Sequence, residues 1–508
     1  MANLSISDRS FAYADFESFL CAPRKCSLAG SARSTIRNSH KTLSNIIASG
    51  KPVYGVNTGF GKLSDIPIKL EDQQQLQLNL VRSHAAGVGS PFDTGITRLA
   101  MVLKIMTIAK GYSGVRLDVA DQLLFFLNHD ILPLMPKQGS VGASGDLAPL
   151  AHMALALIGE GEVHFLDRIM PAMVALKEAG RPPLELHAKE GLSLVNGTQV
   201  STAIGLKAVI EASRIVKSAD IAGALSVEAS LSSKHVFAVK IHRLKKHTGQ
   251  ITSAQNIVNL LKGSEIVQSH ADCGVIQDPY SFRCIPHIHG ASRELFNAVV
   301  DIIENEANSV SDNPLIFPNE EAISSGHFHA EAVAQALDML AISISEIGAI
   351  SERRIHHFMK GIGEDVPPFI TSNPGIESGF MMAHVTAAAI ASENKSLAHP
   401  ASVDSITTSG GQEDMVSMAP WAGRKCLRII RNVAQILAIE CLVSGTVTAV
   451  FHSKKKPGAG TGKAVALLKK HIKFRLEDRP LQKDMETIAN LILQGDLLKT
   501  VTKTIRVK

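Results

Sequence analysis

Residues 142–146, Gly-Ala-Ser-Gly-Asp, carry the groups needed to build an electrophile from the chain itself. If the backbone nitrogen of Gly145 attacks the carbonyl carbon of Ala143 and two waters leave, one of them with the Ser144 hydroxyl, the product is a methylidene-imidazolone. The residue types suit this reaction, because Gly bends freely, Ser has a β-hydroxyl to eliminate and Ala is small. Such a triplet is common, however, and alone it indicates an ordinary turn.

The triplet is informative because of the sequence blocks that accompany it. Seven blocks follow one another along the chain: 54–61, 83–87, 139–152, 196–199, 277–284, 311–315 and 412–414. In type and order they resemble those of the aromatic amino acid ammonia-lyases, and in particular the histidine-specific branch of that family. The resemblance extends from about Leu4 to the Leu476–Pro480 segment.

The resemblance implies non-oxidative deamination of L-histidine to urocanate and ammonia. It also implies that no cofactor is added, because a 4-methylidene-imidazol-5-one forms autocatalytically from Ala143, Ser144 and Gly145. The substrate needs such an electrophile, since ammonia is a poor leaving group and the Cβ proton of the substrate is barely acidic. Two alternatives stay open. In the first, the chain is a tyrosine or phenylalanine ammonia-lyase or an aminomutase on the same scaffold. In the second, it is an inactive helical scaffold, and the presence of the triplet together with Tyr54 and Arg283 argues against this.

Further site residues follow from the resemblance. Tyr54 is expected to be the base at Cβ, and the planar guanidinium of Arg283 to hold the substrate carboxylate. Catalytic roles are also implied for Tyr280 and Glu413. The other implied contacts of substrate and electrophile are Asn196, Gln277, Asn313 and Phe328. A structural role is the alternative for each, because Asn and Gln close loops and aromatic side chains fill cores.

Ser83 and His84 stand where the resemblance places Ser-His in histidine lyases, His-Leu in tyrosine lyases and Phe-Leu in phenylalanine lyases. Glu413 adds a carboxylate suited to an imidazole N–H. A phenyl ring would leave these polar groups unpaired. We therefore expect histidine as the substrate, with a histidine on a helix surface as the alternative for His84.

Several histidines depart from the pattern of histidine lyases. His287, His327 and His384 replace Gln, Asn and Gln, and Met415 stands where His often follows the Gln-Glu-Asp block. These changes put in doubt the polarity of the pocket rather than the class of reaction. His287 with His289, and His327 with His329, lack a Cys or carboxylate partner at fixed spacing, so we expect no metal site.

Composition fits a cytoplasmic enzyme acting on a small molecule. The formal charge of +5 is spread over 52 basic and 47 acidic residues, which argues against nucleic acid as a partner. Six cysteines without a CxxC pair favour reduced thiols, and the polar N-terminus carries no secretory signal. The apolar segment 433–451 is interrupted by Gln435 and Glu440, which indicates burial in protein rather than in a membrane. The resemblance implies a homotetramer with shared active sites.

Helical periodicity dominates the chain, and strand patterns are as short as 162–165. We expect a mainly α fold: a long-helix bundle with a loop-rich N-terminal layer that carries the active-site loops. The layer would cover 1–200 and the bundle with the C-terminal helical segment 201–508, unless both form one continuous unit. The predicted helices are 71–86, 98–110, 119–128, 147–158, 202–230, 292–308, 330–358, 381–397, 423–449 and 483–493.

Overall fold

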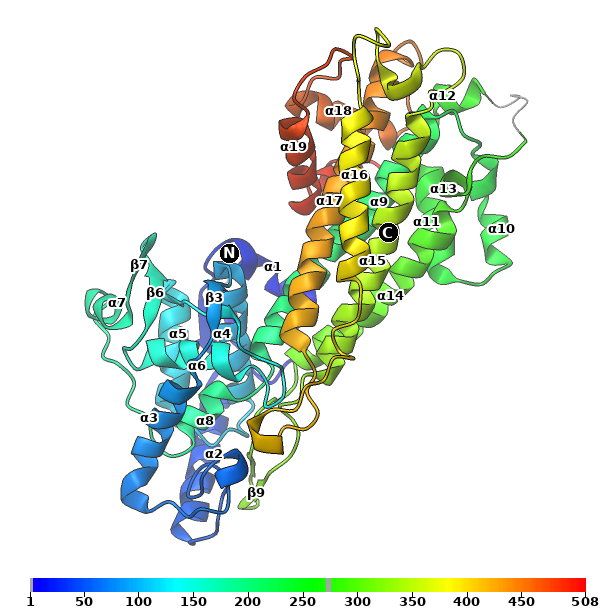
Figure 1. The fold of residues 1–508 in the computed structure, drawn as a ribbon. Coiled ribbons are helices and arrows are strands. Elements are labelled where there is room, and N and C mark those ends of the chain that lie inside the picture. Colours follow the sequence, from blue (N-terminus) through cyan, green and yellow to red (C-terminus); the bar gives the residue numbers. More distant parts are fainter. Residues whose placement is uncertain (1–2, 271–275) are drawn as a thin grey trace. The chain divides into compact units, whose positions relative to one another are not determined.

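A computed structural model describes residues 3–270 and 276–508, and the chain in it is mainly helical, as predicted (Figure 1). Contacts between residues group it into two units. Unit 1 comprises 1–207, 300–338 and 400–424, and unit 2 comprises 208–299, 339–399 and 425–508. The boundary falls inside four long helices: α9 (Gln199–Ala229), α14 (Ile285–Ala307), α15 (Glu331–Phe358) and α17 (Ala419–Val450). The predicted division at residue 200 stays a prediction. The contacts also assign the segments 300–338 and 400–424 to unit 1.

Unit 1 has a core built around one almost fully buried helix, α4 (Thr94–Ala109). Asp93 caps this helix by accepting a hydrogen bond from the Ile96 N–H at 3.1 Å. Within it, Arg98 donates to both carboxylate oxygens of Asp130. The other helices of unit 1 are α1 (Tyr13–Cys21), α2 (Gly30–Ala48), α3 (Gln73–His84), α5 (Leu117–His129), α6 (Leu147–Leu157), α7 (Ala172–Glu178) and α8 (Glu190–Val195).

Four small sheets brace the loops of unit 1. The strands are β1 (Leu4–Ile6) with β2 (Cys26–Leu28), β3 (Val88–Pro91) with β5 (Pro136–Gln138), β4 (Leu132–Pro133) with β6 (Glu162–Phe165) and β7 (Arg168–Pro171), and β8 (Leu315–Phe317) with β9 (Glu321–Ile323). The first pair is parallel and the others are antiparallel. The pair β3–β5 ends at the loop that carries the Ala-Ser-Gly triplet. The strand predicted at 162–165 is confirmed as β6.

Helices α3, α6 and α8 pack against one another in unit 1. This contact decides where three of the sequence blocks lie. His84 ends α3, the Ala-Ser-Gly triplet precedes α6, and Asn196 follows α8. Segments up to about a hundred residues apart in the sequence are thereby joined at one place.

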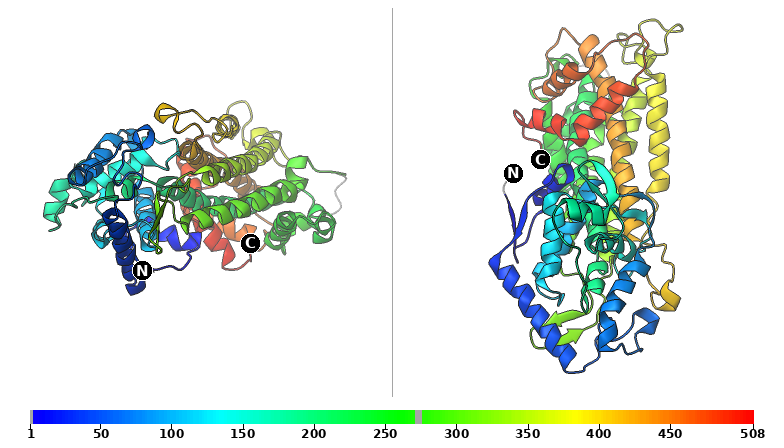
Figure 2. Two further views of the ribbon diagram at one scale, coloured as in Figure 1. Left: turned by 90° about the horizontal axis from the view of Figure 1, so that it is seen from below. Right: turned by 90° about the vertical axis from the view of Figure 1, so that its left-hand side faces the viewer.

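Unit 2 is a bundle in which α16 (Met381–Leu397) lies beside α17, as the right-hand view of Figure 2 shows. Asn432 on α17 donates to Asn394 on α16 at 2.8 Å. Gly348 on α15 has no side chain, which lets α17 approach closely, because a Cβ there would press on Val433. The remaining helices are α10 (Val239–Arg243), α11 (Thr248–Leu260), α12 (Glu265–Gln268), α13 (Tyr280–Arg283), α18 (Thr461–His471), α19 (Gln482–Leu493) and α20 (Asp496–Thr502).

Glu440 explains the polar interruption in the apolar run of α17. Its fully buried carboxylate accepts hydrogen bonds from Arg354 on α15, at 2.5 and 2.9 Å, and from Ser226 on α9 at 2.6 Å. A buried carboxylate requires such partners, and here they are protein groups. Helices α15 and α17 are long and apolar enough to cross a membrane by composition, but 67% and 83% of their most apolar windows are buried inside the protein, as in core helices.

All ten helices predicted from periodicity are present, with ends that shift by up to seven residues. Helix α2 was not predicted, although its buried residues Ala32, Ile36, Leu43 and Ile46 follow helical spacing. Five cysteines, Cys21, Cys26, Cys284, Cys426 and Cys441, are free thiols, and Cys273 lies outside the described residues.

Candidate functional site

The Ala-Ser-Gly triplet lies in a bent loop just before α6. Gly142 and Gly145 both adopt positive φ angles, +71° and +75°, which favour glycine. At Gly145 a side chain is also excluded by space, because a Cβ would collide with the carbonyl of Gly197. Ala143 is buried and Ser144 is partly exposed. The loop therefore holds its middle residue outward on a backbone that only glycine can form.

Backbone hydrogen bonds fasten this loop to the segment after α8. The Asp146 N–H donates to the Gly197 carbonyl at 2.8 Å, and the Gly197 N–H donates to the Ser144 carbonyl at 3.4 Å. The buried carboxylate of Asp146 accepts hydrogen bonds from the backbone N–H and the hydroxyl of Ser201, both at 2.7 Å. Burial raises the pKa of Asp146 to about 6, although these hydrogen bonds oppose the increase. The triplet is thus held from both of its ends.

The Ser144 hydroxyl donates a hydrogen bond to Glu413 Oε1 at 2.8 Å. The other oxygen of this carboxylate accepts hydrogen bonds from the hydroxyls of Thr408 at 2.6 Å and Ser409 at 2.7 Å. Burial by itself would raise the pKa of Glu413, but the three hydroxyl groups together lower it. Glu413 is therefore a carboxylate at neutral pH, fixed beside the residue from which the electrophile would form.

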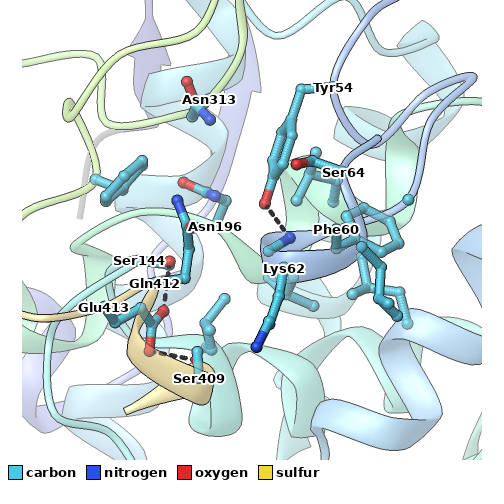
Figure 3. Close-up of a pocket in the computed structure, with 18 of the residues that line it drawn as sticks. Tyr54, Phe60, Lys62, Ser64, Ser144, Asn196, Asn313, Ser409, Gln412 and Glu413 are labelled. Atoms are coloured by element: carbon cyan, nitrogen blue, oxygen red, sulfur yellow. Dashed lines mark hydrogen bonds between the residues drawn. The ribbon is translucent and has the colours of Figure 1, made fainter. Parts of the chain in front are cut away.

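A cavity of about 1100 Å³ opens at this pair (Figure 3). All the residues that line it belong to unit 1. Nine of the residues predicted for the site are among them: Tyr54, Ser83, His84, Ala143, Ser144, Asn196, Asn313, Phe328 and Glu413. Gly145 belongs to the same loop but is buried behind it. The structure thus brings together most of the residues that the sequence singled out.

Tyr54 points its hydroxyl into the cavity (Figure 3). The hydroxyl oxygen accepts a hydrogen bond from the Gly61 N–H at 2.9 Å, which leaves the hydroxyl proton uncommitted. The ring meets Phe60 edge to face, with centroids 6.2 Å apart. The ring is therefore fixed while its oxygen is free to exchange a proton with a bound molecule.

His84 presents one ring nitrogen to the cavity. Its Nδ1 lies 2.9 Å from the carbonyl oxygen of Leu80, which can only accept, so Nδ1 carries the proton. Burial lowers the pKa of His84, which keeps the ring neutral at pH 7. Its Nε2 is then an unprotonated acceptor.

Two asparagine amides complete the polar part of the cavity wall. Asn196 is almost fully buried, and its side-chain oxygen has no hydrogen-bond partner among the described residues. Asn313 accepts a hydrogen bond from the Ser325 N–H at 2.7 Å, so its amide nitrogen is left to donate. Buried amide groups usually find partners, so an unpaired oxygen on a cavity wall indicates a missing ligand or prosthetic group.

Three predicted residues lie elsewhere. Gln277, Tyr280 and Arg283 belong to unit 2, at and just before the single turn of α13. The Arg283 guanidinium lies over the Tyr280 ring, 4.9 Å from its centroid, and makes no ion pair with the described residues. Gln277 and Tyr280 are exposed. A cationic group and two polar side chains are therefore grouped on unit 2 without a carboxylate partner.

Of the four departures from the histidine-lyase pattern, only Met415 lines the cavity. His384 is paired with Glu352 at 2.9 Å, and the His287 ring lies 5.5 Å from that of His242. The exposed His327 contacts the Ser325 hydroxyl at 3.1 Å. Among the described residues no group of three His, Cys, Asp or Glu side chains could hold a metal ion.

The sequence did not identify the residues that support Glu413 or the triplet. Thr408 and Ser409 fix the carboxylate, Asp146 anchors the loop, and Lys62 lines the cavity beside Tyr54. Lys62 directly follows the block 54–61, and Asp146 belongs to the block 139–152. Their positions in the sequence could therefore have identified them. Thr408 and Ser409 carry no such signal, because hydroxyl residues of this type are common in loops.

Comparison with known proteins identifies the family of the chain. The pattern of the family described as aromatic amino acid lyase matches residues 12–470. This chain belongs to that family. It is 44% identical to histidine ammonia-lyase of Sorangium cellulosum over 98% of both chains. The crystal structure of histidine ammonia-lyase from Trypanosoma cruzi superimposes with a TM-score of 0.91 at 37% identity, covering 99% of this chain and 95% of that one. Tyrosine aminomutase from Streptomyces globisporus superimposes with a TM-score of 0.93 at 30% identity over both entire chains.

Proposed function

We propose that this member of the aromatic amino acid lyase family deaminates L-histidine to urocanate and ammonia. One observation carries the proposal: Ser144 of the triplet, His84 and Glu413 meet in a single cavity. The relatives named histidine ammonia-lyase, at 37 to 44% identity over nearly the whole chain, support it.

The loop residues fit a methylidene-imidazolone made from Ala143, Ser144 and Gly145. Gly145 adopts a φ of +75° that favours glycine, the Ser144 hydroxyl is accessible from the cavity, and the Asn196 side chain lines the same cavity, where its amide nitrogen can donate to the ring carbonyl. Once formed, the group supplies a carbon electrophile that makes the amine a better leaving group. Asn196 and Asn313 would orient it, and Phe328 would cover it.

His84 and Glu413 are suited to recognise an imidazole. Both present acceptors at neutral pH, His84 through Nε2 and Glu413 through its carboxylate oxygens, which together match the two N–H donors of a protonated imidazole ring. A neutral imidazole ring, with one N–H, pairs with one of them. In the unmodified chain the Ser144 hydroxyl donates to Glu413 Oε1. Loss of that hydroxyl on cyclisation removes this donor, so the carboxylate becomes free to accept an imidazole N–H. A phenyl ring offers no donor, so Glu413 Oε1 would stay without a partner, and a phenol offers a single O–H.

Tyr54 would remove the Cβ proton, and the Arg283 guanidinium would hold the substrate carboxylate in a two-pronged hydrogen bond. We propose that the chain forms a homotetramer with shared active sites, in which Gln277, Tyr280 and Arg283 of one copy complete the cavity of another. The exposed Tyr280 and the unpaired cation support this arrangement. The enzyme would act in the cytoplasm.

Initial rates on L-histidine, L-tyrosine and L-phenylalanine, measured side by side, test the proposed substrate. We expect L-histidine to have the highest kcat/KM, because its ring can donate to both His84 and Glu413, whereas a phenol has one donor and a phenyl ring has none. One unpaired buried polar group costs about 1–3 kcal/mol, which corresponds to a preference of roughly 5- to 150-fold. The conjugated product is followed by its ultraviolet absorbance, and chromatography for a β-amino acid detects mutase activity. Preference for an aromatic hydrocarbon ring would refute the substrate while leaving the class of reaction intact.

Exchanging the pair Ser83 and His84 for Phe and Leu tests the specificity position. We expect the double variant, Ser83→Phe with His84→Leu, to lose at least about tenfold in kcat/KM on L-histidine, because the imidazole loses one hydrogen-bond acceptor. Turnover of L-phenylalanine relative to L-histidine should rise. The matched control is Ser83→Ala, which keeps the imidazole of His84 and removes a hydroxyl that donates to the Leu80 carbonyl and lies 3.1 Å from His84 Nδ1. Unchanged kcat/KM in the double variant would exclude His84 from substrate recognition.

A further inference from the structure

A lysine lies where the packing alone would call for an apolar residue. Lys104 sits in the middle of α4 and is completely buried. Its ammonium group donates to the backbone carbonyls of Ser193 at 2.9 Å and Asn196 at 2.6 Å. Burying an ammonium group is unfavourable unless it is fully paired, so its presence in the core calls for a role other than packing.

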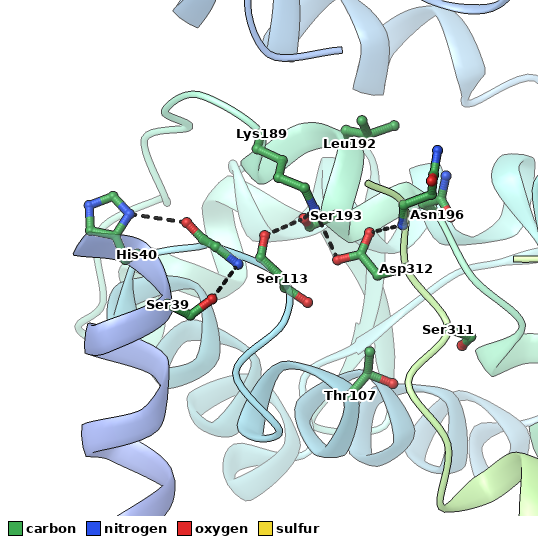
Figure 4. Close-up of polar contacts among 12 residues, drawn as sticks. Ser39, His40, Thr107, Ser113, Lys189, Leu192, Ser193, Asn196, Ser311 and Asp312 are labelled. Carbon is green, nitrogen blue, oxygen red and sulfur yellow. Dashed lines mark hydrogen bonds and ion pairs between the residues drawn. The ribbon is translucent and has the colours of Figure 1, made fainter. Parts of the chain in front are cut away.

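A second completely buried lysine lies close by. Lys189 donates to the Ser193 hydroxyl at 2.8 Å and to Asp312 Oδ2 at 3.2 Å (Figure 4). The other oxygen of Asp312 accepts a hydrogen bond from the Asn313 N–H at 2.7 Å. Ser193 thus contacts both ammonium groups, Lys104 through its carbonyl and Lys189 through its hydroxyl.

Both lysines lead directly to the cavity wall. The carbonyl that Lys104 holds belongs to Asn196, whose unpaired amide lines the cavity. The next residue, Gly197, makes the two backbone hydrogen bonds to Ser144 and Asp146. Lys189 reaches Asn313, the second amide of the wall, through one carboxylate.

We propose that Lys104 and Lys189 are positioning residues for the reaction: Lys104 fixes the Asn196–Gly197 segment that holds the triplet and one amide, and Lys189 fixes the Asp312–Asn313 turn that holds the other. An ammonium group suits this task because it has three donors and can join several acceptors at once. Both parts of this inference rest on the proposed function: the part that concerns turnover rests on the proposed substrate, and the part that concerns ring closure rests only on the proposed methylidene-imidazolone.

Two carboxylates accompany the two lysines. Asp312 from the loop before β8 and Asp146 from the loop before α6 face the two lysines, and all four groups are buried. Burial lowers the pKa of Lys104 to about 7, and the two carboxylates oppose the decrease. Neutralising one lysine would therefore leave a carboxylate uncompensated as well as releasing the backbone carbonyls.

The test compares Lys104→Met with Lys104→Gln. Met fills similar space without a donor, whereas Gln keeps an amide donor without the charge. The matched control is Lys425→Met, because Lys425 is also buried and donates to a backbone carbonyl, that of His399, but belongs to unit 2. For each purified protein we would measure the cyclised fraction by intact mass, kcat and KM on L-histidine, and the thermal midpoint.

We expect Lys104→Met to show a lower cyclised fraction, and a kcat per cyclised chain lower by about 10- to 100-fold with a smaller change in KM. Lys104→Gln should recover part of both losses. Lys425→Met should lower the thermal midpoint but keep the cyclised fraction and kcat. Lys104→Met values within about twofold of those of Lys425→Met would overturn the proposal for Lys104.

The test still decides the question in two less favourable cases. If Lys104→Met does not fold, Lys104→Gln and Lys189→Met are compared with Lys425→Met under the same criterion. If the wild-type chain is inactive on L-histidine, the proposed function fails, but the cyclised fraction of the lysine variants still decides whether the pair positions the triplet.

Discussion

Ser144→Ala is expected to fold and to lose on the order of 10³-fold or more in turnover, the scale seen when a covalent route is removed. The side chain is partly exposed to the cavity, and its one hydrogen bond goes to Glu413, so its removal should cost little stability. Without the β-hydroxyl no second water can leave and no methylidene group can form. The intact mass of the wild-type chain should fall two waters below the encoded value, whereas that of Ser144→Ala should lack this full deficit.

A second variant separates the loss of the electrophile from a disturbance of Glu413. Ser409→Ala removes a different hydroxyl bonded to the same carboxylate and leaves Ser144 intact. We expect it to retain the mass deficit and most of the activity. An active wild-type preparation with the full encoded mass would refute the proposal that the chain forms its own electrophile.

The sequence predicted the reactive residues of the cavity better than the residues that hold them in place. Ser144, His84 and Glu413 were identified because each lies in a recognisable block, and the structure brings them together. Lys104 was not identified, because a single lysine in an apolar helical pattern is usually read as a residue on the solvent face. Its burial depends on the helices and loops packed around α4, and these come from distant parts of the chain.

Domain organisation shows the same limit. Segments 300–338 and 400–424 join unit 1 through tertiary contacts, such as the hydrogen bond between Ser144 and Glu413, which are 269 residues apart. Helical periodicity reports which face of an element is buried and not which partner covers it. It therefore predicted α15, α16 and α17 well but not the assignment of segments to units.

Tyr54→Phe is expected to reduce kcat on L-histidine by about 10²- to 10⁴-fold, the usual contribution of a general base, with a smaller change in KM. Phe preserves the edge-to-face contact with Phe60 and removes the oxygen that faces the cavity. The Gly61 N–H loses its acceptor, at a cost of about 1–3 kcal/mol if water does not replace it. That cost falls on stability, so kcat and the thermal midpoint measured together distinguish it from loss of the base.

Two comparisons complete this test of Tyr54. Tyr112→Phe is the matched control, because Tyr112 also belongs to unit 1 and packs against a phenylalanine, Phe317, but does not line the cavity. It should keep wild-type turnover. Substrate deuterated at Cβ should react more slowly than ordinary L-histidine in Tyr54→Phe, because removal of that proton becomes the slow step. Wild-type rates for Tyr54→Phe, together with a large loss for Tyr280→Phe, would transfer the role of base to Tyr280.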